Sequence, residues 1–270
     1  MKKILILYFS GAGATKKVAE CMHARLSQHC EAELFSVESK DMPSMDGYDS
    51  LIIGTPTHHA APAKSIMNYL NTMPRLIQKA PVFIFNTRGL YALNTNRILA
   101  KQLRKKNMIT IMDRAYRSPA SDGSLIAPFV KRFFAFEKGL EKKINRDCAH
   151  FLALLNKDAS RGYIPRFRFG SIFNAPNKAA GQLVTAKIYL HKDKCVKCHQ
   201  CIHQCAHKIV STDHDGYPLI ASQGCENCYR CIHHCPKAAL SLSKRRAPKK
   251  LLRYSGRAHV LDSPPIEYVE

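Results

Sequence analysis

CVKCHQCIHQC, residues 195–205, recurs as CENCYRCIHHC at residues 225–235. Each of the four cysteines in the first copy has a counterpart 30 positions later, and Ile202-His203 recurs as Ile232-His233. A fixed internal period indicates one structural unit used twice. The repeat therefore organises the C-terminal part of the chain, and its cysteines are the first candidates for a functional site.

The spacing within each copy is Cys-x2-Cys-x2-Cys-x3-Cys, a pattern typical of iron–sulfur ligands. A 4Fe–4S cube has four irons, and each iron needs one thiolate. Three cysteines with two residues between neighbours can wrap one region of the cube in a tight loop, while the fourth lies just beyond that loop. The repeat therefore predicts two 4Fe–4S clusters.

The region from about residue 186 to residue 243 resembles the bacterial two-cluster ferredoxin family, with eight cysteines in register. In that family the fourth cysteine of each run ligates the other cluster. The resemblance implies that one cluster is held by Cys195, Cys198, Cys201 and Cys235. It implies that the other is held by Cys225, Cys228, Cys231 and Cys205.

Three other interpretations of these cysteines explain less of the pattern. A structural zinc site commonly uses two separated Cys-x2-Cys pairs, which leaves the third cysteine of each run redundant. Cys195-x2-Cys198-His199 matches the c-type haem attachment pattern, but Tyr229 stands at the position equivalent to His199. A disulfide framework requires an oxidising compartment, and we find no sequence signal for export.

The composition of the 270 residues is strongly basic, with 42 Lys and Arg, 20 Asp and Glu, and a formal net charge of +22. This charge favours an acidic redox partner, nucleic acid or an anionic membrane surface, and selects none of them. The apolar run Ile4–Phe9 is too short for a signal peptide, and no run approaches the length of a membrane span. We therefore expect a cytoplasmic protein without a transmembrane segment.

The N-terminus reads as a buried strand, Ile4–Phe9, followed by the loop Ser10-Gly11-Ala12-Gly13-Ala14-Thr15 and a helix up to Ser27. Such a loop binds phosphate, because its amides and the helix N-terminus point at one anion. It matches neither a P-loop nor a Rossmann fingerprint. Ser10, Gly13 and Thr15 instead resemble the flavodoxin phosphate loop, Ser/Thr-x-Thr-Gly-x-Thr, with Ala12 and Ala14 replacing its usual polar residues.

Further strands are predicted at 33–37, 48–54, 81–85 and 108–112, with helices near 63–72 and 94–106 between them. This alternation predicts an α/β doubly wound parallel sheet, and the flavodoxin resemblance implies the order 2-1-3-4-5. Ligands of such sheets bind beyond the carboxyl ends of the strands. Two more loops are thereby placed at the candidate FMN site: Thr55, Pro56, Thr57 and His58, and Asn86, Thr87, Arg88, Gly89 and Tyr91. Tyr91 or His58 is a candidate to stack on the flavin ring.

We expect a first domain at residues 1–155, which ends in one or two long helices over 127–155. A linker with basic and aromatic residues follows at 156–185, and the ferredoxin module occupies 186–243. Residues 244–270 form a basic tail, read as solvated or as a docking patch for an acidic redox partner. The histidines of the repeat are read as solvent-facing helix residues, and Cys21, Cys30 and Cys148 as buried thiols.

The order of the two modules resembles the fused flavodoxin–ferredoxin family. This resemblance implies an electron-transfer iron–sulfur flavoprotein that passes single electrons between two 4Fe–4S clusters and an FMN, and a reductase is one form of that function. Two alternatives stay open: an electron carrier that uses the clusters only, above an empty flavodoxin-like domain, and a redox-sensing nucleic-acid-binding protein.

Overall fold

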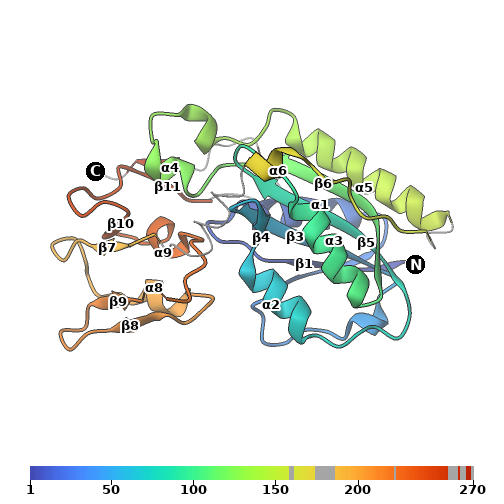
Figure 1. Ribbon diagram of the computed structural model, residues 1–270, viewed down its shortest axis with the longest axis horizontal. Coiled ribbons are helices and arrows are strands. Elements are labelled where there is room, and N and C mark those ends of the chain that lie inside the picture. Colours follow the sequence, from blue (N-terminus) through green and yellow to red (C-terminus); the bar gives the residue numbers. More distant parts are fainter. Residues whose placement is uncertain (158–160, 174–185, 222, 255–260, 262–265, 269–270) are drawn as a thin grey trace.

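The computed structural model describes residues 1–157, 161–173, 186–221, 223–254, 261 and 266–268 (Figure 1). Its first domain is built on a six-stranded sheet in the order β2-β1-β3-β5-β6, with the short β4 paired to β3. The parallel strands are β1 Lys3–Tyr8, β2 Glu31–Ser36, β3 Ser50–His58, β5 Ala80–Arg88 and β6 Met108–Arg117, and β4 Ala61–Pro62 is antiparallel. Counted without β4, this is the predicted 2-1-3-4-5 order, and the flavodoxin-like fold is confirmed.

Helices cover both faces of this sheet. One face packs against α1 Ala14–Leu26 and α5 Leu140–Asn156, and the other against α2 Lys64–Thr72 and α3 Thr95–Lys105. Ile4 and Leu5, which are adjacent in β1, belong to opposite cores and are both fully buried. Burial on two faces explains why β1 is apolar from Ile4 onward. None of the helices in the described ranges has the length and apolar character that a membrane span requires.

Three of the parallel strands run further than predicted, because polar residues at their carboxyl ends still pair. β3 continues to His58, β5 to Arg88 and β6 to Arg117, where the predicted strands ended at 54, 85 and 112. Asn86, Thr87 and Arg88 pair in register with Ala115–Arg117 of β6. The segments predicted as loops at 55–58 and 86–88 are therefore strand ends.

The long helix predicted over 127–155 was wrong in its first half. α5 begins only at Leu140, directly after Gly139, which has a left-handed backbone with φ 68°. The chain before it forms the short α4 Gly123–Ile126 and a 3-10 turn, Lys131–Phe134. Three predicted buried thiols are confirmed: burial raises the pKa of Cys21 and of Cys148 to about 12, and also raises that of Cys30.

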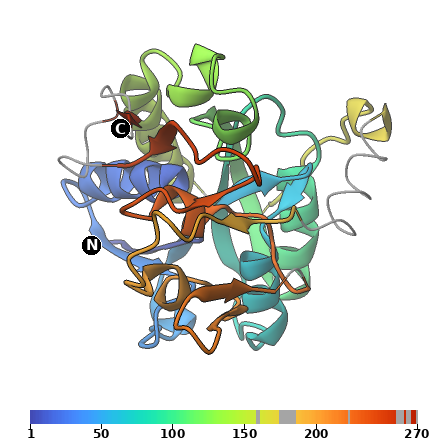
Figure 2. The ribbon, with the colours of Figure 1, turned by 90° about the vertical axis from the view of Figure 1, so that its left-hand side faces the viewer.

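The C-terminal module lies at the carboxyl edge of the sheet, at the end of the molecule opposite the N-terminus (Figures 1 and 2). Its elements are β7 Tyr189–Leu190, α8 Gln200–His203, β8 Val210–Thr212, β9 Pro218–Ile220, α9 Arg230–His233 and β10 Leu240–Ser241. The sequence repeat recurs in the backbone: α8 follows His199 at φ 58° and α9 follows Tyr229 at φ 56°. Two non-glycine residues thus hold a left-handed conformation that usually favours glycine.

The basic tail contains a buried strand, so the expectation of a solvated tail was wrong there. β11 Lys250–Leu252 pairs with β12 Ile266–Tyr268, and the side chains of Leu251 and Leu252 are fully buried. Residues 161–173 of the predicted linker include α6 Gly170–Phe173 and lie against the first domain: Tyr163 donates its backbone N–H to Thr110. Residues 174–185 of that linker lie outside the described residues.

Candidate functional site

The loop Ser10–Thr15 joins β1 to α1 and has the geometry of an anion site. Its Gly13 has φ 117° and directly precedes the 13-residue α1, whose N-terminus favours negative charge. Ser10 Oγ is buried and has no hydrogen-bond partner among the described residues. Thr15 Oγ1 lies 2.7 Å from Thr87 Oγ1 at the end of β5. A buried hydroxyl without a partner fits a ligand that accepts hydrogen bonds.

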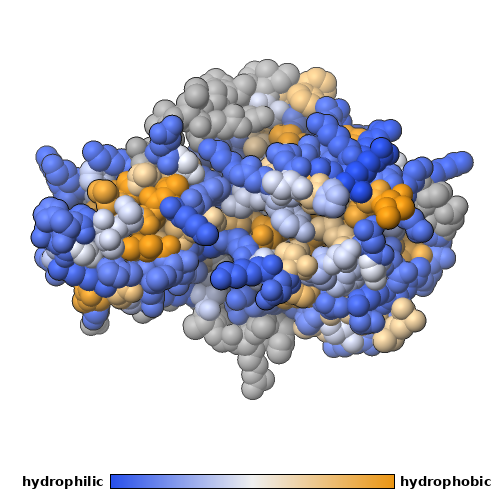
Figure 3. Space-filling model, turned by 90° about the horizontal axis from the view of Figure 1, so that it is seen from below, coloured by the Kyte–Doolittle hydropathy of each residue, from blue (hydrophilic) through white to orange (hydrophobic). Residues whose placement is uncertain are grey.

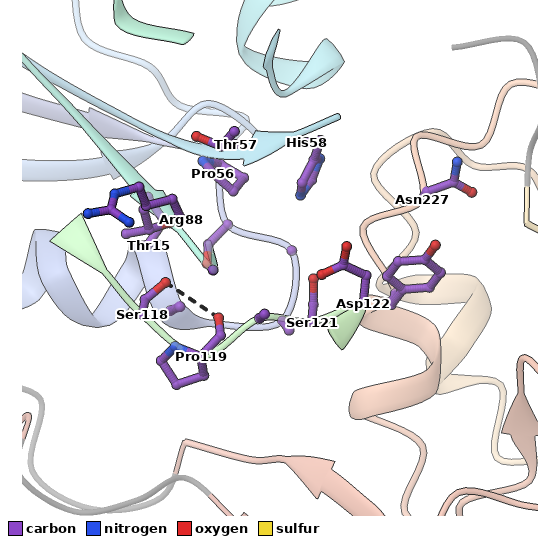
Figure 4. Close-up of a pocket in the computed structure, with 18 of the residues that line it drawn as sticks. Thr15, Pro56, Thr57, His58, Arg88, Ser118, Pro119, Ser121, Asp122 and Asn227 are labelled. Carbon is purple, nitrogen blue, oxygen red and sulfur yellow. Dashed lines mark hydrogen bonds between the residues drawn. The ribbon is translucent and has the colours of Figure 1, made fainter. Parts of the chain in front are cut away.

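A cavity with about 580 Å³ of empty space, part of it open to solvent, lies beside this loop (Figure 4). Of the predicted flavin residues, eleven line it: Ser10, Gly11, Ala12, Ala14, Thr15, Pro56, Thr57, His58, Thr87, Arg88 and Gly89. Figure 4 shows His58 and Asp122 between the sheet edge and the module that carries Asn227. The structure thus brings the ends of β1, β3 and β5 together around one space.

Four predicted flavin residues do not line that cavity. Thr55 and Asn86 are buried beneath it, where Thr55 Oγ1 accepts from the Ala63 N–H and Asn86 donates to Asn96. Gly13 is covered from outside, because a Cβ there would lie 2.4 Å from the ring of Tyr254. Tyr91 is 71% exposed and lines a different cavity.

Two further parts of the cavity wall were missed from the sequence. One is the segment Ser118–Asp122 after β6, and the other is Asn227 with Tyr229 from the C-terminal module. The first could have been found, since SPASDG is a polar stretch after a predicted strand at the same sheet edge. The second could not, because the approach of a separate module leaves no local pattern.

The four cysteines predicted for one cluster, Cys195, Cys198, Cys201 and Cys235, line a single pocket with about 370 Å³ of empty space. Burial raises the pKa of the Cys201 thiol to about 11, and among its neighbouring cysteines Cys235 adds most to the shift. Cys235 comes from the other copy of the repeat, as the crossed ligand assignment requires. We call this group cluster site I.

The other four cysteines, Cys205, Cys225, Cys228 and Cys231, form cluster site II. Burial raises the pKa of Cys225, and Cys205 of the first copy contributes to the shift. Burial also raises the pKa of Cys228 to about 12. Among the described residues, no group of three or more His, Cys, Asp or Glu is arranged to hold a single metal ion. Thiols of this kind lose their protons when they bind a metal.

Site II lies directly against the phosphate loop of the first domain. A Cβ at Gly11 would lie 2.8 Å from the carbonyl oxygen of Cys228 and 2.9 Å from its Cβ. Only glycine allows this approach, because any side chain would overlap the backbone of the cluster ligand. The contact joins a predicted ligand of the second cluster to the predicted FMN loop.

Arg230 of α9 holds this contact together. Its guanidinium donates from Nη2 to Ser10 O at 2.6 Å, from Nε to Gly11 O at 3.2 Å and from Nη1 to Gln204 O at 2.8 Å. It also forms a two-pronged ion pair with Glu38, with distances of 2.7 and 2.6 Å. The planar fork of an arginine suits such a set of acceptors.

A second anchor is the buried carboxylate of Glu226, next to Cys225. Its Oε2 accepts from the Ser65 N–H at 2.9 Å, from Ser65 Oγ at 3.0 Å and from His207 Nε2 at 2.9 Å. Burial opposes the ionisation of Glu226, but the hydrogen bond from His207 and its other neighbours hold the pKa below the usual value. The carboxylate satisfies the first turn of α2, and so ties site II to the first domain.

The third anchor is His233, which corrects the reading of this histidine as solvent-facing. It is fully buried: Nδ1 accepts from the Leu252 N–H at 3.1 Å, and Nε2 lies 2.9 Å from Ser121 O. These partners require a neutral ring with its proton on Nε2, and burial lowers the pKa of His233 to about 4. The ring joins β11 and the segment after β6 to the cluster module.

Comparison with known proteins agrees with this division of the chain. Residues 5–125 match the flavodoxin domain family, and residues 187–246 match the 4Fe-4S dicluster domain family. The two lie in the order expected for a fused flavodoxin/ferredoxin protein, and together they support an electron-transfer protein with an iron–sulfur domain. No curated protein matched the chain.

Several solved structures are similar to the first part of the chain. A flavodoxin from the domain Archaea is 14% identical with a TM-score of 0.39, over 56% of this chain and 99% of its own. Oxidised Flavodoxin 1 from Bacillus cereus is 13% identical with a TM-score of 0.41, over 56% and 97%. A flavoprotein in complex with FMN from Lactobacillus acidophilus is 22% identical with a TM-score of 0.35, over 47% and 98%.

Proposed function

We propose, from the union of a flavodoxin domain with a 4Fe-4S dicluster domain, that the protein transfers single electrons between two 4Fe–4S clusters and an FMN bound at the carboxyl edge of its sheet. The contact of Cys228 with Gly11 carries this proposal. It sets a ligand of cluster site II against the loop that would hold the FMN phosphate. The two cofactors would then be neighbours within one rigid interface.

The residues around the flavin cavity fit the phosphate end of FMN. Ser10 Oγ offers an unused buried donor, and the loop amides at the start of α1 offer more. Ala12 and Ala14 contribute no polar side chain, so the backbone and Ser10 would provide most of the affinity. When bound, FMN supplies a centre that accepts one or two electrons, which lets single electrons combine for a two-electron reaction.

The two cluster sites would differ in their exposure to solvent. Cys198 of site I is exposed, whereas Cys228 of site II is covered by the first domain. Cys201 of site I lies close enough to Cys231 of site II to add to the rise in the pKa of Cys231 that burial causes. An electron would enter at site I, pass to site II and reach the flavin loop through Cys228 and Gly11. Each step moves one electron and breaks no bond.

We further propose an acidic one-electron carrier as the partner at site I. Val196 lines the pocket of site I and is 57% exposed, and Leu219, which follows the lining residue Pro218, is 59% exposed. Figure 3 shows apolar surface on this module among hydrophilic residues. Lys192 and Lys197 lie over the ring of Tyr217, with Nζ 4.6 and 4.3 Å from its centroid. An apolar centre beside lysines favours a partner with an acidic rim.

The test is the cofactor content of protein purified without oxygen. We expect about one FMN in the supernatant after acid precipitation and about eight iron atoms per chain. Eight irons with no flavin, even after incubation with excess FMN, would refute the flavin part of the proposal. The remaining function would then be electron transfer through the clusters alone.

A further inference from the structure

A second large cavity, which the function proposed above does not use, shares Arg88 with the candidate flavin cavity. It has about 1950 Å³ of empty space, part of it open to solvent. Its wall comes from four segments: the end of β5 with the loop after it, the first turn of α3, residues 113–115 of β6 and residues 163–168 of the linker. The carboxyl edge of the sheet therefore carries two adjoining spaces.

The wall of this cavity has a strong excess of positive charge. It contains one carboxylate, Asp113, and five arginines: Arg88, Arg97, Arg114, Arg166 and Arg168. The carboxylate is already satisfied, because Oδ1 accepts from Tyr163 Oη at 2.6 Å and Oδ2 accepts from Asn96 Nδ2 at 3.0 Å. Asp113 offsets one of the five positive charges, and both of its oxygens already accept hydrogen bonds.

Two of the arginines build the wall. Arg114 pairs with Asp147 at 3.0 Å, and Arg97 donates to Pro165 O at 2.8 Å. Within the described part of the chain, the guanidinium groups of Arg166 and Arg168 have no hydrogen bond or ion pair. These two groups remain available to a ligand.

Arg88 lines both cavities, and nearby arginines affect its pKa. Its Nη1 donates to Leu90 O at 2.6 Å, which holds the side chain against its own loop. Burial lowers the pKa of Arg88 and Glu137 opposes the shift, while three nearby arginines lower the pKa further: Arg117 and Arg132, which lie outside this wall, and Arg168, which lines it. A bound anion would relieve that repulsion.

Aromatic surface lies beside the charges. Tyr91 is 71% exposed and Tyr163 is 44% exposed, and both line the cavity. Rings with open faces can stack on a planar ligand, and tyrosine does so at little entropic cost. The wall thus offers guanidinium groups for charge and phenol rings for a flat body.

We propose that this cavity binds an organic anion with at least two negative charges and a planar ring. Guanidinium groups recognise phosphate and carboxylate by paired hydrogen bonds, so a nucleotide and an aromatic polycarboxylate share the required chemistry. Binding here needs no FMN, because the phosphate loop takes no part in it.

Titration calorimetry at low salt tests the site with three probes: adenosine 5′-diphosphate, benzene-1,3,5-tricarboxylate and inorganic pyrophosphate. The double variant Arg166→Gln/Arg168→Gln should weaken all three at least about a hundred-fold, as expected for two lost charged hydrogen bonds. The control Lys101→Gln/Arg104→Gln removes the same charge from exposed positions of α3 and should change affinity less than about two-fold. Binding of adenosine 5′-diphosphate without binding of the tricarboxylate would identify a nucleotide site. Binding of the tricarboxylate without binding of adenosine 5′-diphosphate would identify a carboxylate site.

A second variant separates the ring from the charge. Tyr91→Ala should weaken the two ring-bearing probes about five-fold and leave pyrophosphate unchanged. Absence of binding by every probe, or equal losses in the α3 control, would each overturn the proposal. None of these results depends on whether electrons pass from the clusters to a flavin.

Discussion

The two copies of the cysteine repeat have the same backbone conformation, but one copy is exposed to solvent and the other is packed against the first domain. In the first copy the residues between the cysteines are exposed or partly exposed, whereas in the second they are largely buried. Equivalent positions differ accordingly: Val196 and Glu226, Lys197 and Asn227, Gln200 and Arg230, His203 and His233. The repeat supplies two equivalent groups of cysteines, and the residues between the cysteines decide which group meets the flavodoxin domain.

Each anchor of the second copy reaches a different part of the first domain. Arg230 binds the loop after β1, Glu226 binds the start of α2, and His233 lies 2.9 Å from Ser121 O after β6. Three separate contacts fix both position and rotation of the module. The difference between the copies therefore gives the C-terminal module one exposed end and one end that is docked on the first domain.

The largest effect should come from substituting the fourth cysteine of either copy by serine. Cys205→Ser should remove the docked cluster, and Cys235→Ser the exposed one, because each fourth cysteine serves the other site. Iron analysis should give about half the wild-type content for both variants. Electron paramagnetic resonance of the reduced proteins would tell the two remaining clusters apart. Loss of the exposed cluster in Cys205→Ser would contradict the crossed assignment.

Truncation of the residue after the position of Tyr229 should destabilise the protein strongly in the second copy, where it is Arg230, and little in the first copy, where it is Gln200. Arg230→Ala leaves Glu38 and two loop carbonyls without their partner, and we expect a loss of about 3 kcal/mol in the free energy of unfolding. Gln200→Ala, at the equivalent exposed position, should change it by less than about 0.5 kcal/mol. Urea unfolding of the anaerobic holoprotein measures both. Equal losses would mean that the docked copy is not special.

The histidine pair gives a smaller contrast. His233→Ala leaves the Leu252 N–H and Ser121 O buried without partners, which should cost about 2 kcal/mol of unfolding free energy. His203→Ala removes an exposed side chain and should be close to neutral. The same urea experiment applies. A neutral His233→Ala would show that this contact does not stabilise the interface.

The smallest effect should appear at the open end, in rate and not in stability. Lys192→Glu/Lys197→Glu should slow reduction of the protein by an acidic ferredoxin about ten-fold at low salt, with the difference fading as salt screens the charges. Lys101→Glu/Lys105→Glu, on α3, is the matched control. Stopped-flow absorbance records both. An identical slowing in the control would attribute the effect to net charge and not to site I.

The local patterns of the sequence were sufficient to predict the fold class, and they singled out the cysteines and the loop that the structure places at the carboxyl edge of the sheet. Cysteine spacing and the Ser10–Thr15 loop depend on neighbouring residues, so one sequence predicts them well. Strand ends were harder, because the last residues of β6, Ala115–Arg117, pair with the polar residues Asn86–Arg88 at the end of β5. In these strands the run of apolar residues ends before the backbone hydrogen bonds between the strands do.

The interface could not be predicted for a different reason. Nothing near Arg230 in the sequence shows that its partners are Ser10 and Glu38, about 200 positions away. The buried pair Leu251-Leu252 was hidden in the same way within a run of basic residues. A signal was present in the repeat itself: Glu226 and Arg230 replace Val196 and Gln200, and such divergence marks the copy with an added role.

The most direct test of the account is the reduction of bound flavin after the clusters receive a rapid pulse of electrons. The docked copy predicts flavin reduction at a rate that does not depend on protein concentration, and that Arg230→Ala slows while Gln200→Ala does not. A rate that rises in proportion to protein concentration, or a flavin that stays oxidised while both clusters are reduced, would contradict electron transfer across the Cys228–Gly11 contact.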